Sequence, residues 1–107
     1  MSYKVIPINS FQREAKRLLK KYPSLRNEIE SLYKQLELQP FEGTPLGHDC
    51  FKIRMSIQSK GRGKSREARV ITHIHVFENI VYILSMYDKS EKSDISLKEL
   101  ERLIATI

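Results

Sequence analysis

Basic side chains are concentrated in one short segment, SKGRGKSREAR at residues 59–69, where five of the eleven residues are Lys or Arg. Its letters Gly63-Lys64-Ser65 match the end of a phosphate-binding loop. That loop also needs an earlier glycine at a fixed spacing and a helix directly after it. The chain has Gln58 where the glycine belongs, and a strand-like pattern follows. The sequence therefore argues against a nucleoside-triphosphate site.

The cationic residues continue into both flanking stretches, CFKIRMSI and ARVITHIHV, whose alternation of apolar and polar side chains predicts strands. Lys52 and Arg54 share one side of the first strand, and Arg69 takes a similar position on the second. Side chains on neighbouring strands converge. Because uncompensated cations repel one another, the cluster predicts a phosphate or RNA ligand. The alternative is a solvated loop that only aids solubility.

The spacing of apolar residues predicts the remaining elements. Ser96 and Glu99 have the spacing of a capping box at the start of a last helix. The order β-α-α-β-β-β-α predicts an α+β fold, a small antiparallel sheet with helices packed on one face. The other face would carry the strand cations. The predicted elements are a strand at 3–8, helices at 11–22 and 25–36, a loop at 39–49, strands at 50–57, 68–76 and 80–87, and the final helix.

Length and charge limit the class of protein. The 107 residues fit a single domain over residues 1–107, and the net charge of +6 favours a polyanionic partner, most often nucleic acid. The one cysteine, Cys50, fits a reducing compartment. No apolar run reaches the roughly 18 residues of a membrane helix, and no cleavable apolar segment opens the chain. We therefore expect a cytoplasmic protein without a membrane partner.

Over essentially its whole length the chain resembles the RelE/ParE-like toxins of bacterial type II toxin–antitoxin systems. The matching stretches are the opening strand, the helical hairpin with KRLLKKYPSL, the strands with FKIR and ARVI, and MYDKSEKSDIS before a last helix. The resemblance implies the RelE-like fold and a cognate antitoxin that wraps around the toxin.

Many members of this family are ribosome-dependent mRNA endonucleases, and others of similar fold inhibit DNA gyrase. The resemblance thus implies a metal-independent endoribonuclease that inhibits translation, with the ribosome and mRNA as partners and no cofactor. The alternatives are a ParE-like gyrase inhibitor and a non-catalytic RNA-binding domain of the same fold.

Metal-free cleavage of RNA needs a base for the 2′-hydroxyl, cations for the charge on phosphate, and an acid for the leaving oxygen. By position, the resemblance assigns Arg54 and Arg69 as phosphate clamps, because a guanidinium can hold two oxygens. Lys52 is the candidate base if neighbouring cations lower its pKa. Lys89 falls where the family has a basic residue after the last strand.

Many relatives carry a tyrosine near the last helix, at about the position of Ile95. Ile95 instead has the position of a hydrophobic staple with Leu100. Tyr87 and Asp88, at the end of the last strand, are therefore candidates for catalysis in place of that tyrosine.

The remaining candidates are RNA-binding residues. His73 and His75 share one strand face, but a metal site would need a third ligand, and the sequence places none nearby, so we expect no metal. His73 is also a candidate general base. The predicted RNA-binding residues are Lys60, Arg62, Lys64, Arg66 and His73.

Overall fold

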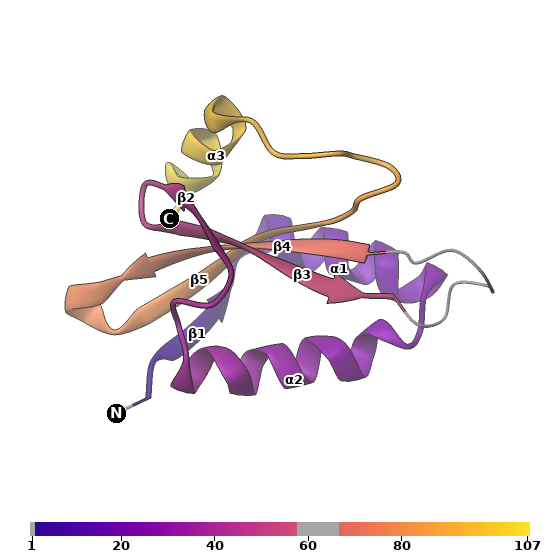
Figure 1. The fold of residues 1–107 in the computed structure, drawn as a ribbon, viewed down its shortest axis with the longest axis horizontal. Helices are drawn as coiled ribbons and strands as arrows, with labels where there is room; N and C mark the ends of the chain where they lie inside the picture. Colours follow the sequence, from indigo (N-terminus) through magenta and orange to yellow (C-terminus); the bar gives the residue numbers. More distant parts are fainter. Residues whose placement is uncertain (1, 58–66) are drawn as a thin grey trace.

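The computed structural model describes residues 2–57 and 67–107 and contains one five-stranded sheet in the order β1-β5-β4-β3-β2 (Figure 1). The elements in chain order are β1 (Lys4–Pro7), α1 (Asn9–Lys21), α2 (Leu25–Leu38), β2 (Thr44–Gly47), β3 (Cys50–Ser56), β4 (Glu67–His75), the short 3₁₀ helix η1 (Val76–Glu78), β5 (Ile80–Asp88) and α3 (Leu97–Ile104).

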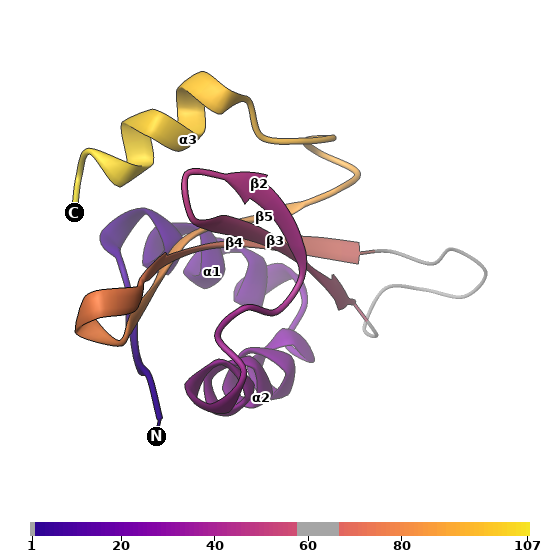
Figure 2. The same cartoon turned by 60° about the vertical axis from the view of Figure 1, so that its left-hand side comes forward.

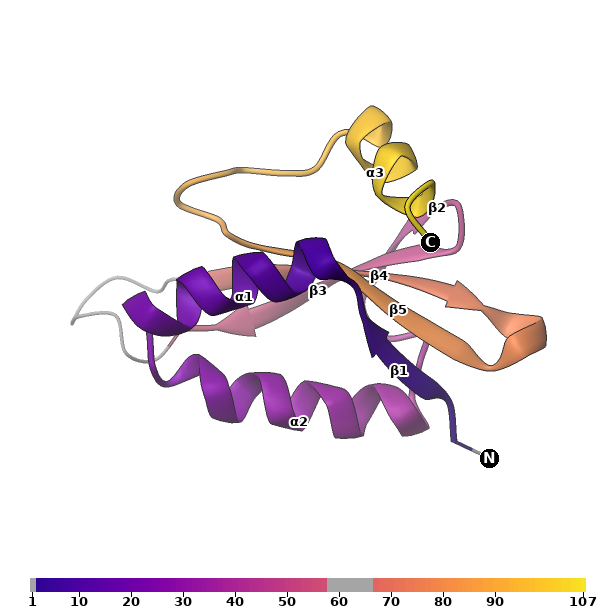
Figure 3. The same ribbon diagram turned by 180° about the vertical axis from the view of Figure 1, so that it is seen from behind.

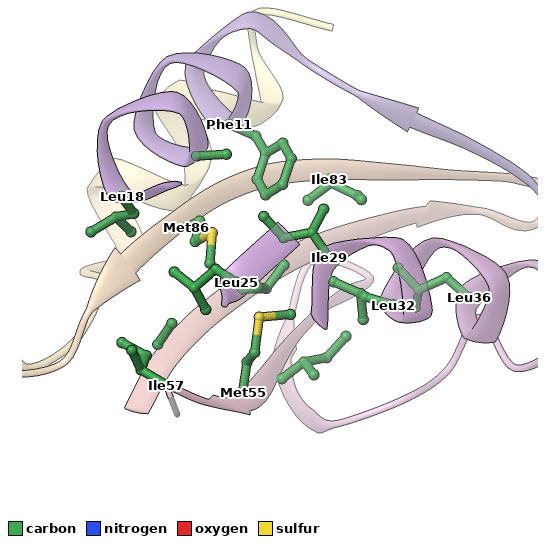
Figure 4. Packing of buried hydrophobic residues seen from close by; sticks show 14 of the residues in the cluster. Phe11, Leu18, Leu25, Ile29, Leu32, Leu36, Met55, Ile57, Ile83 and Met86 are labelled. Carbon is green, nitrogen blue, oxygen red and sulfur yellow. The ribbon is translucent and has the colours of Figure 1, made fainter. Parts of the chain in front are cut away.

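Helices α1 and α2 lie side by side against one face of the sheet (Figure 3). Each helix repeats apolar residues at helical spacing, so that one stripe faces the strands. This stripe meets side chains of β3, β4 and β5 in the main core (Figure 4). The buried residues of the two helices are Phe11, Ala15, Leu18, Leu25, Ile29, Leu32 and Leu36.

Helix α3 covers the opposite face of the sheet (Figure 2), so the prediction that all helices share one face is wrong. The reason is that this second face also carries apolar residues. Ile71 and Leu84 are fully buried there, and Leu100 of α3 packs against them. The predicted start of the helix is confirmed, because the Ser96 hydroxyl accepts a hydrogen bond from the Glu99 N–H at 3.1 Å.

The α+β class and the antiparallel run β3-β4-β5 are as predicted, but the sheet is mixed and has one more strand. β1 pairs in parallel with β5, and α1, α2 and the following strands form the long crossover that a parallel pair needs. The predicted loop at 39–49 contains β2, which pairs with β3. Its turn residues, His48 and Asp49, have φ angles of 54° and 57°, as in a type I′ hairpin.

A bulge in β5 decides which way its second half faces. Ile71 pairs with Ser85 but Thr72 pairs with Ile83, so Leu84 is an extra residue in β5. Before the bulge Ile83 faces α1 and α2, and after it Met86 does. Tyr87 is thereby turned toward the α3 face, beside Leu84.

Within the described ranges, no helix has the length and apolar character needed to cross a membrane.

Gly43 and Gly47 allow a matched test of how β2 is held. Both have positive φ, of 98° and 89°, but a Cβ on Gly43 would lie 2.4 Å from the Lys52 carbonyl oxygen, whereas one on Gly47 would meet nothing within 4 Å. We expect Gly47→Ala to cost about 1–2 kcal/mol of unfolding free energy from backbone strain alone. Gly43→Ala should cost clearly more, because β2 must move away from β3. Urea unfolding measures both, and equal losses would contradict the close approach.

Candidate phosphate-binding site

Three candidate residues lie in a row across the central strands, on the α3 face of the sheet. Arg54 of β3 is directly opposite Arg69 of β4, and Arg69 is directly opposite Tyr87 of β5. Side chains in such cross-strand positions have Cβ atoms about 5 Å apart. Arg54 is exposed, whereas Arg69 is only 4% exposed and Tyr87 only 3%. The row therefore runs from solvent into the protein.

Glu67 holds the Arg69 side chain in place. The two residues are two positions apart on β4, and the Arg69 guanidinium donates to the Glu67 carboxylate. This hydrogen bond lowers the pKa of the Glu67 carboxyl, and the charges of Arg69, Arg54 and Lys89 lower it further. Lys89 is also tied to this end of β4, because its N–H donates to the Glu67 carbonyl at 3.0 Å. Three cations thus surround one carboxylate, which leaves an excess of positive charge.

Lys52 meets a different carboxylate. Its ammonium nitrogen lies 3.5 Å from Asp94, which belongs to the linker at residues 89–96. The pKa of Asp94 is lowered, first by the N–H of Ile95 at 2.9 Å and then by the charge of Lys52. The Asp94 half of the pair is open to water, with its side chain 61% exposed, whereas the Lys52 side chain is 24% exposed. Because such exposed ion pairs contribute at most about 1 kcal/mol, an incoming anion can readily replace Asp94.

Among the residues that the structure describes, Arg54 forms no ion pair. Its charge reaches Glu67, but that carboxylate is hydrogen-bonded to Arg69. Arg54 is therefore the cation of the row whose guanidinium is available to a ligand.

The Tyr87 hydroxyl is buried and makes no hydrogen bond of standard geometry within the described part of the chain, although the Asp94 carboxylate lies close enough to interact with it. Burial raises its pKa to about 12, and the negative charge of Asp94 acts in the same direction. The Lys92 ammonium covers the ring at 5.3 Å from its centre. The hydroxyl therefore keeps its proton at neutral pH and can act as a hydrogen-bond donor or an acid.

The linker at residues 89–96 crosses the α3 face beside these residues (Figures 1 and 2). Glu91 fixes one end of the linker to α1 through Arg17 at 2.9 Å and Lys21 at 3.3 Å. Lys92, the next residue, forms an ion pair with Glu99, so two adjacent linker residues are tied to α1 and to α3. Lys92 of the linker thus covers the Tyr87 ring, whereas Arg54 stays exposed.

Two predicted residues lie away from this row. Asp88 is fully buried on the α1 side of the sheet, where its carboxylate accepts hydrogen bonds from the Tyr22 hydroxyl at 3.2 Å and from Ser90. His73 lies four residues along β4 from Arg69, roughly 13 Å away, with buried Ile71 between them. Lys60, Arg62, Lys64 and Arg66 lie outside the described residues.

The structure brings together Lys52, Arg54, Arg69, Tyr87 and Lys89 of the predicted site. It adds two carboxylates that were not assigned a role, Glu67 and Asp94. Glu67 could have been found from its spacing, since residues two apart on a strand share a face. Asp94 gives no such signal, because its position depends on the path of the linker.

Solved structures of toxins resemble this one. The Escherichia coli toxin RelE, in the free state and with two arginines changed to alanine, matches with a TM-score of 0.62 over 100% of this chain and 99% of that chain, at 15% sequence identity. The chain has the RelE-like toxin fold. A metal-bound toxin from Helicobacter pylori matches with a TM-score of 0.50 over 84% of this chain and 98% of that one, at 16% identity. No family model matches the chain, and no curated protein matches its sequence significantly.

The poorly paired Tyr87 hydroxyl leads to a stability prediction. Tyr87→Phe removes a buried polar group whose one contact, with Asp94, falls outside standard hydrogen-bond geometry, so we expect the free energy of unfolding to rise by up to about 1 kcal/mol. The matched control is Tyr22→Phe, which removes a hydroxyl that does donate to Asp88 and should cost about 1 kcal/mol. Urea unfolding measures both variants. A clear loss of stability in Tyr87→Phe would show that its hydroxyl has a partner after all.

Proposed function

We propose that this protein is the toxin of a type II toxin–antitoxin system and that it cleaves mRNA on the ribosome without using a metal ion. The observation that carries the proposal is the group of Arg54, Arg69 and Lys89 around one carboxylate, next to a buried tyrosine hydroxyl. The RelE-like toxin fold supports the assignment to this class of toxin.

The proposed reaction is an internal transfer of the phosphoryl group. The 2′-oxygen attacks the adjacent phosphorus, a new O2′–P bond forms, and the P–O5′ bond breaks. The products are a 2′,3′-cyclic phosphate and a 5′-hydroxyl. One proton leaves the 2′-hydroxyl and one reaches the 5′-oxygen, so the protein must supply a base, an acid and cations for the phosphate oxygens.

We assign the cationic role to Arg54 and Arg69. Arg54 is exposed and forms no ion pair within the described residues, so it can hold two phosphate oxygens. Arg69 is oriented by Glu67 and cannot turn away. Lys89 adds charge at the same end of β4.

We assign the acid to Tyr87 and the base to Lys52, which must first lose the proton that its ion pair with Asp94 favours. A tyrosine whose pKa is about 12 holds its proton until an alkoxide forms, and the leaving 5′-oxygen is a stronger base than that. For the base, arginine does not lose its proton, and the lowered pKa values of Glu67 and Asp94 make both weak bases. Lys52 lies two residues from Arg54 on the same face of β3. Asp88, buried against α1, has a structural role in this scheme.

Induced expression followed by primer extension on cellular mRNA tests the activity. Wild-type protein should produce cuts in phase with codons. Arg54→Ala should reduce the cleavage rate by about 10²–10³-fold, the usual effect of removing one group that stabilises developing charge. The matched control is Arg13→Ala, which removes an exposed arginine from α1 and should leave cleavage unchanged.

Other outcomes of that experiment distinguish the alternatives. Intact mRNA together with arrested DNA replication would show a gyrase inhibitor instead. RNA binding without cleavage or growth arrest would show a non-catalytic domain. Growth arrest and cleavage that persist in both Arg54→Ala and Arg69→Ala would place the catalytic site elsewhere.

We also propose where the antitoxin is held. A groove of about 360 Å³ runs between α1 and α2, with an apolar floor that includes Leu19, Ile29 and Tyr33. Its rim is cationic, formed by Lys16, Lys20 and Arg26. The occupant that matches both features is an amphipathic, acidic segment of the antitoxin.

Leu19→Glu tests this groove, because it places a carboxylate in the apolar floor. Toxicity should persist while the antitoxin encoded next to the toxin binds at least 10-fold more weakly, as measured by calorimetry with purified proteins. The control is Leu38→Glu, at an exposed position at the end of α2. Equal binding by both variants and the wild type would show that the antitoxin uses another surface.

A further inference from the structure

The linker between β5 and α3 places a carboxylate between the two groups to which we assign proton transfer. Lys52 on β3 and Tyr87 on β5 are separated by β4, so their backbones are roughly 10 Å apart. Asp94 of the linker meets both side chains. One of its oxygens lies 3.5 Å from the Lys52 ammonium nitrogen, and its carboxylate is close enough to the Tyr87 hydroxyl to interact with it. The protein without a ligand thus already holds an anion at this point.

A substrate phosphate needs the same position. In the proposed cleavage the base acts on the 2′-oxygen and the acid on the 5′-oxygen, so the phosphorus has to lie between Lys52 and Tyr87. A carboxylate and a phosphate diester each carry one negative charge, and both present oxygen atoms that accept hydrogen bonds. The carboxylate of Asp94 and the phosphate therefore compete for the same donors.

Contacts within the linker hold Asp94 at this position. The Oδ1 atom that meets Lys52 also accepts a hydrogen bond from the N–H of Ile95 at 2.9 Å. Two residues earlier, the ion pair of Lys92 with Glu99 ties the linker to α3. A group tethered in this way acts at an effective concentration on the order of millimolar. An anion arriving from solution has to exceed that concentration or form additional contacts.

We propose that Asp94 is an internal inhibitor of the site, a carboxylate that occupies the phosphate position until a substrate that also binds Arg54 displaces it. The roles of Lys52 and Tyr87 rest on the proposed function, whereas the competition between two anions does not require cleavage. Arg54 is exposed and forms no ion pair among the described residues, so it offers the incoming phosphate an additional contact. RNA that further contacts hold against the protein overcomes the inhibition more easily than free RNA does.

Binding of inorganic phosphate and of a short 2′-O-methyl RNA tests this inhibition, because neither probe can be cleaved. Asp94→Asn removes the charge and keeps an oxygen that can accept the Ile95 N–H, so the linker should keep its path. We expect both probes to bind this variant roughly 3–5-fold more tightly than the wild type, as for the loss of one exposed ion pair. Nuclear magnetic resonance titration of the full-length protein at constant ionic strength measures the affinities, and the signals of Lys52 and Tyr87 locate the bound anion.

Glu101→Gln is the matched control. It removes the same charge from a side chain of α3 that is 55% exposed, against 61% for Asp94, and that lies 3.7 Å from His48. Phosphate binding should change less than 2-fold in this variant. Combining Asp94→Asn with Lys52→Ala completes a double-mutant cycle, in which the gain from Asp94→Asn should largely disappear.

Three results would overturn the inference. The first is wild-type affinity in Asp94→Asn. The second is an equal gain in Glu101→Gln, which would show a general effect of net charge. The third is a gain that persists in the Lys52→Ala background, which would mean that Asp94 acts elsewhere. Circular dichroism of each variant confirms that it is folded.

Failure of the proposed function gives a different result. Intact cellular mRNA together with tighter phosphate binding by Asp94→Asn would reject the cleavage and keep the internal inhibitor. Codon-phased cleavage together with unchanged phosphate binding would keep the function and reject the inhibitor.

Discussion

The burial of β4 on both faces is the constraint on which the rest of the structure depends. Seven consecutive residues of this strand, Ala68 to Ile74, are buried. β3 and β5 pair with its two edges, α1 and α2 lie on one side, and α3 lies on the other. A charged side chain in such a strand must have a partner, because an unpaired buried guanidinium is strongly unfavourable. Glu67, at the half-exposed start of the strand, supplies that partner to Arg69.

On the α3 face of β4, the polar and charged side chains therefore lie near the two ends of the strand. Arg69 and Glu67 lie at the start of the strand, and His73 and His75 lie at its end. Between them the α3 face is filled by Ile71, which packs with Leu100. The bulge at Leu84 is needed for the first of these ends, because without the extra residue Tyr87 would face α1 instead of Arg69.

The sequence predicted much of this arrangement because its strongest signals are local. Helical spacing located α1 and α2, and alternation located β3, β4 and β5 together with the shared face of Lys52 and Arg54. The features it did not predict depend on contacts between distant parts of the chain. The position of α3 follows from apolar residues on the second face, and the parallel pairing of β1 follows from the free edge of β5.

Two errors have a more specific physical origin. Gly and Pro residues at 39–49 indicated a loop, but a two-residue turn and an edge strand use the same residue types. Asp88 is next to Tyr87 in sequence, and adjacent residues of a strand point to opposite faces, so the two could not both join Arg69. If alternation along the strand had been applied strictly, Asp88 would have been predicted on the opposite face of the sheet from Tyr87.

The candidate site is divided into a fixed half and an exchangeable half. Arg69 and Glu67 form the fixed half, because both partners lie in β4 and Arg69 is buried. Lys52 and Asp94 form the exchangeable half, because this pair is exposed and joins the sheet to a linker. In the proposed binding mode, a phosphate that replaced Asp94 would exchange one anion for another at Lys52 and would gain Arg54, which has no ion-pair partner in the described residues. The fixed pair stays in place during this exchange, so the guanidinium of Arg69 and the hydroxyl of Tyr87 are positioned before any ligand arrives. In the cleavage proposed above, preorganisation of this kind would favour the charge distribution of the transition state over that of the bound substrate.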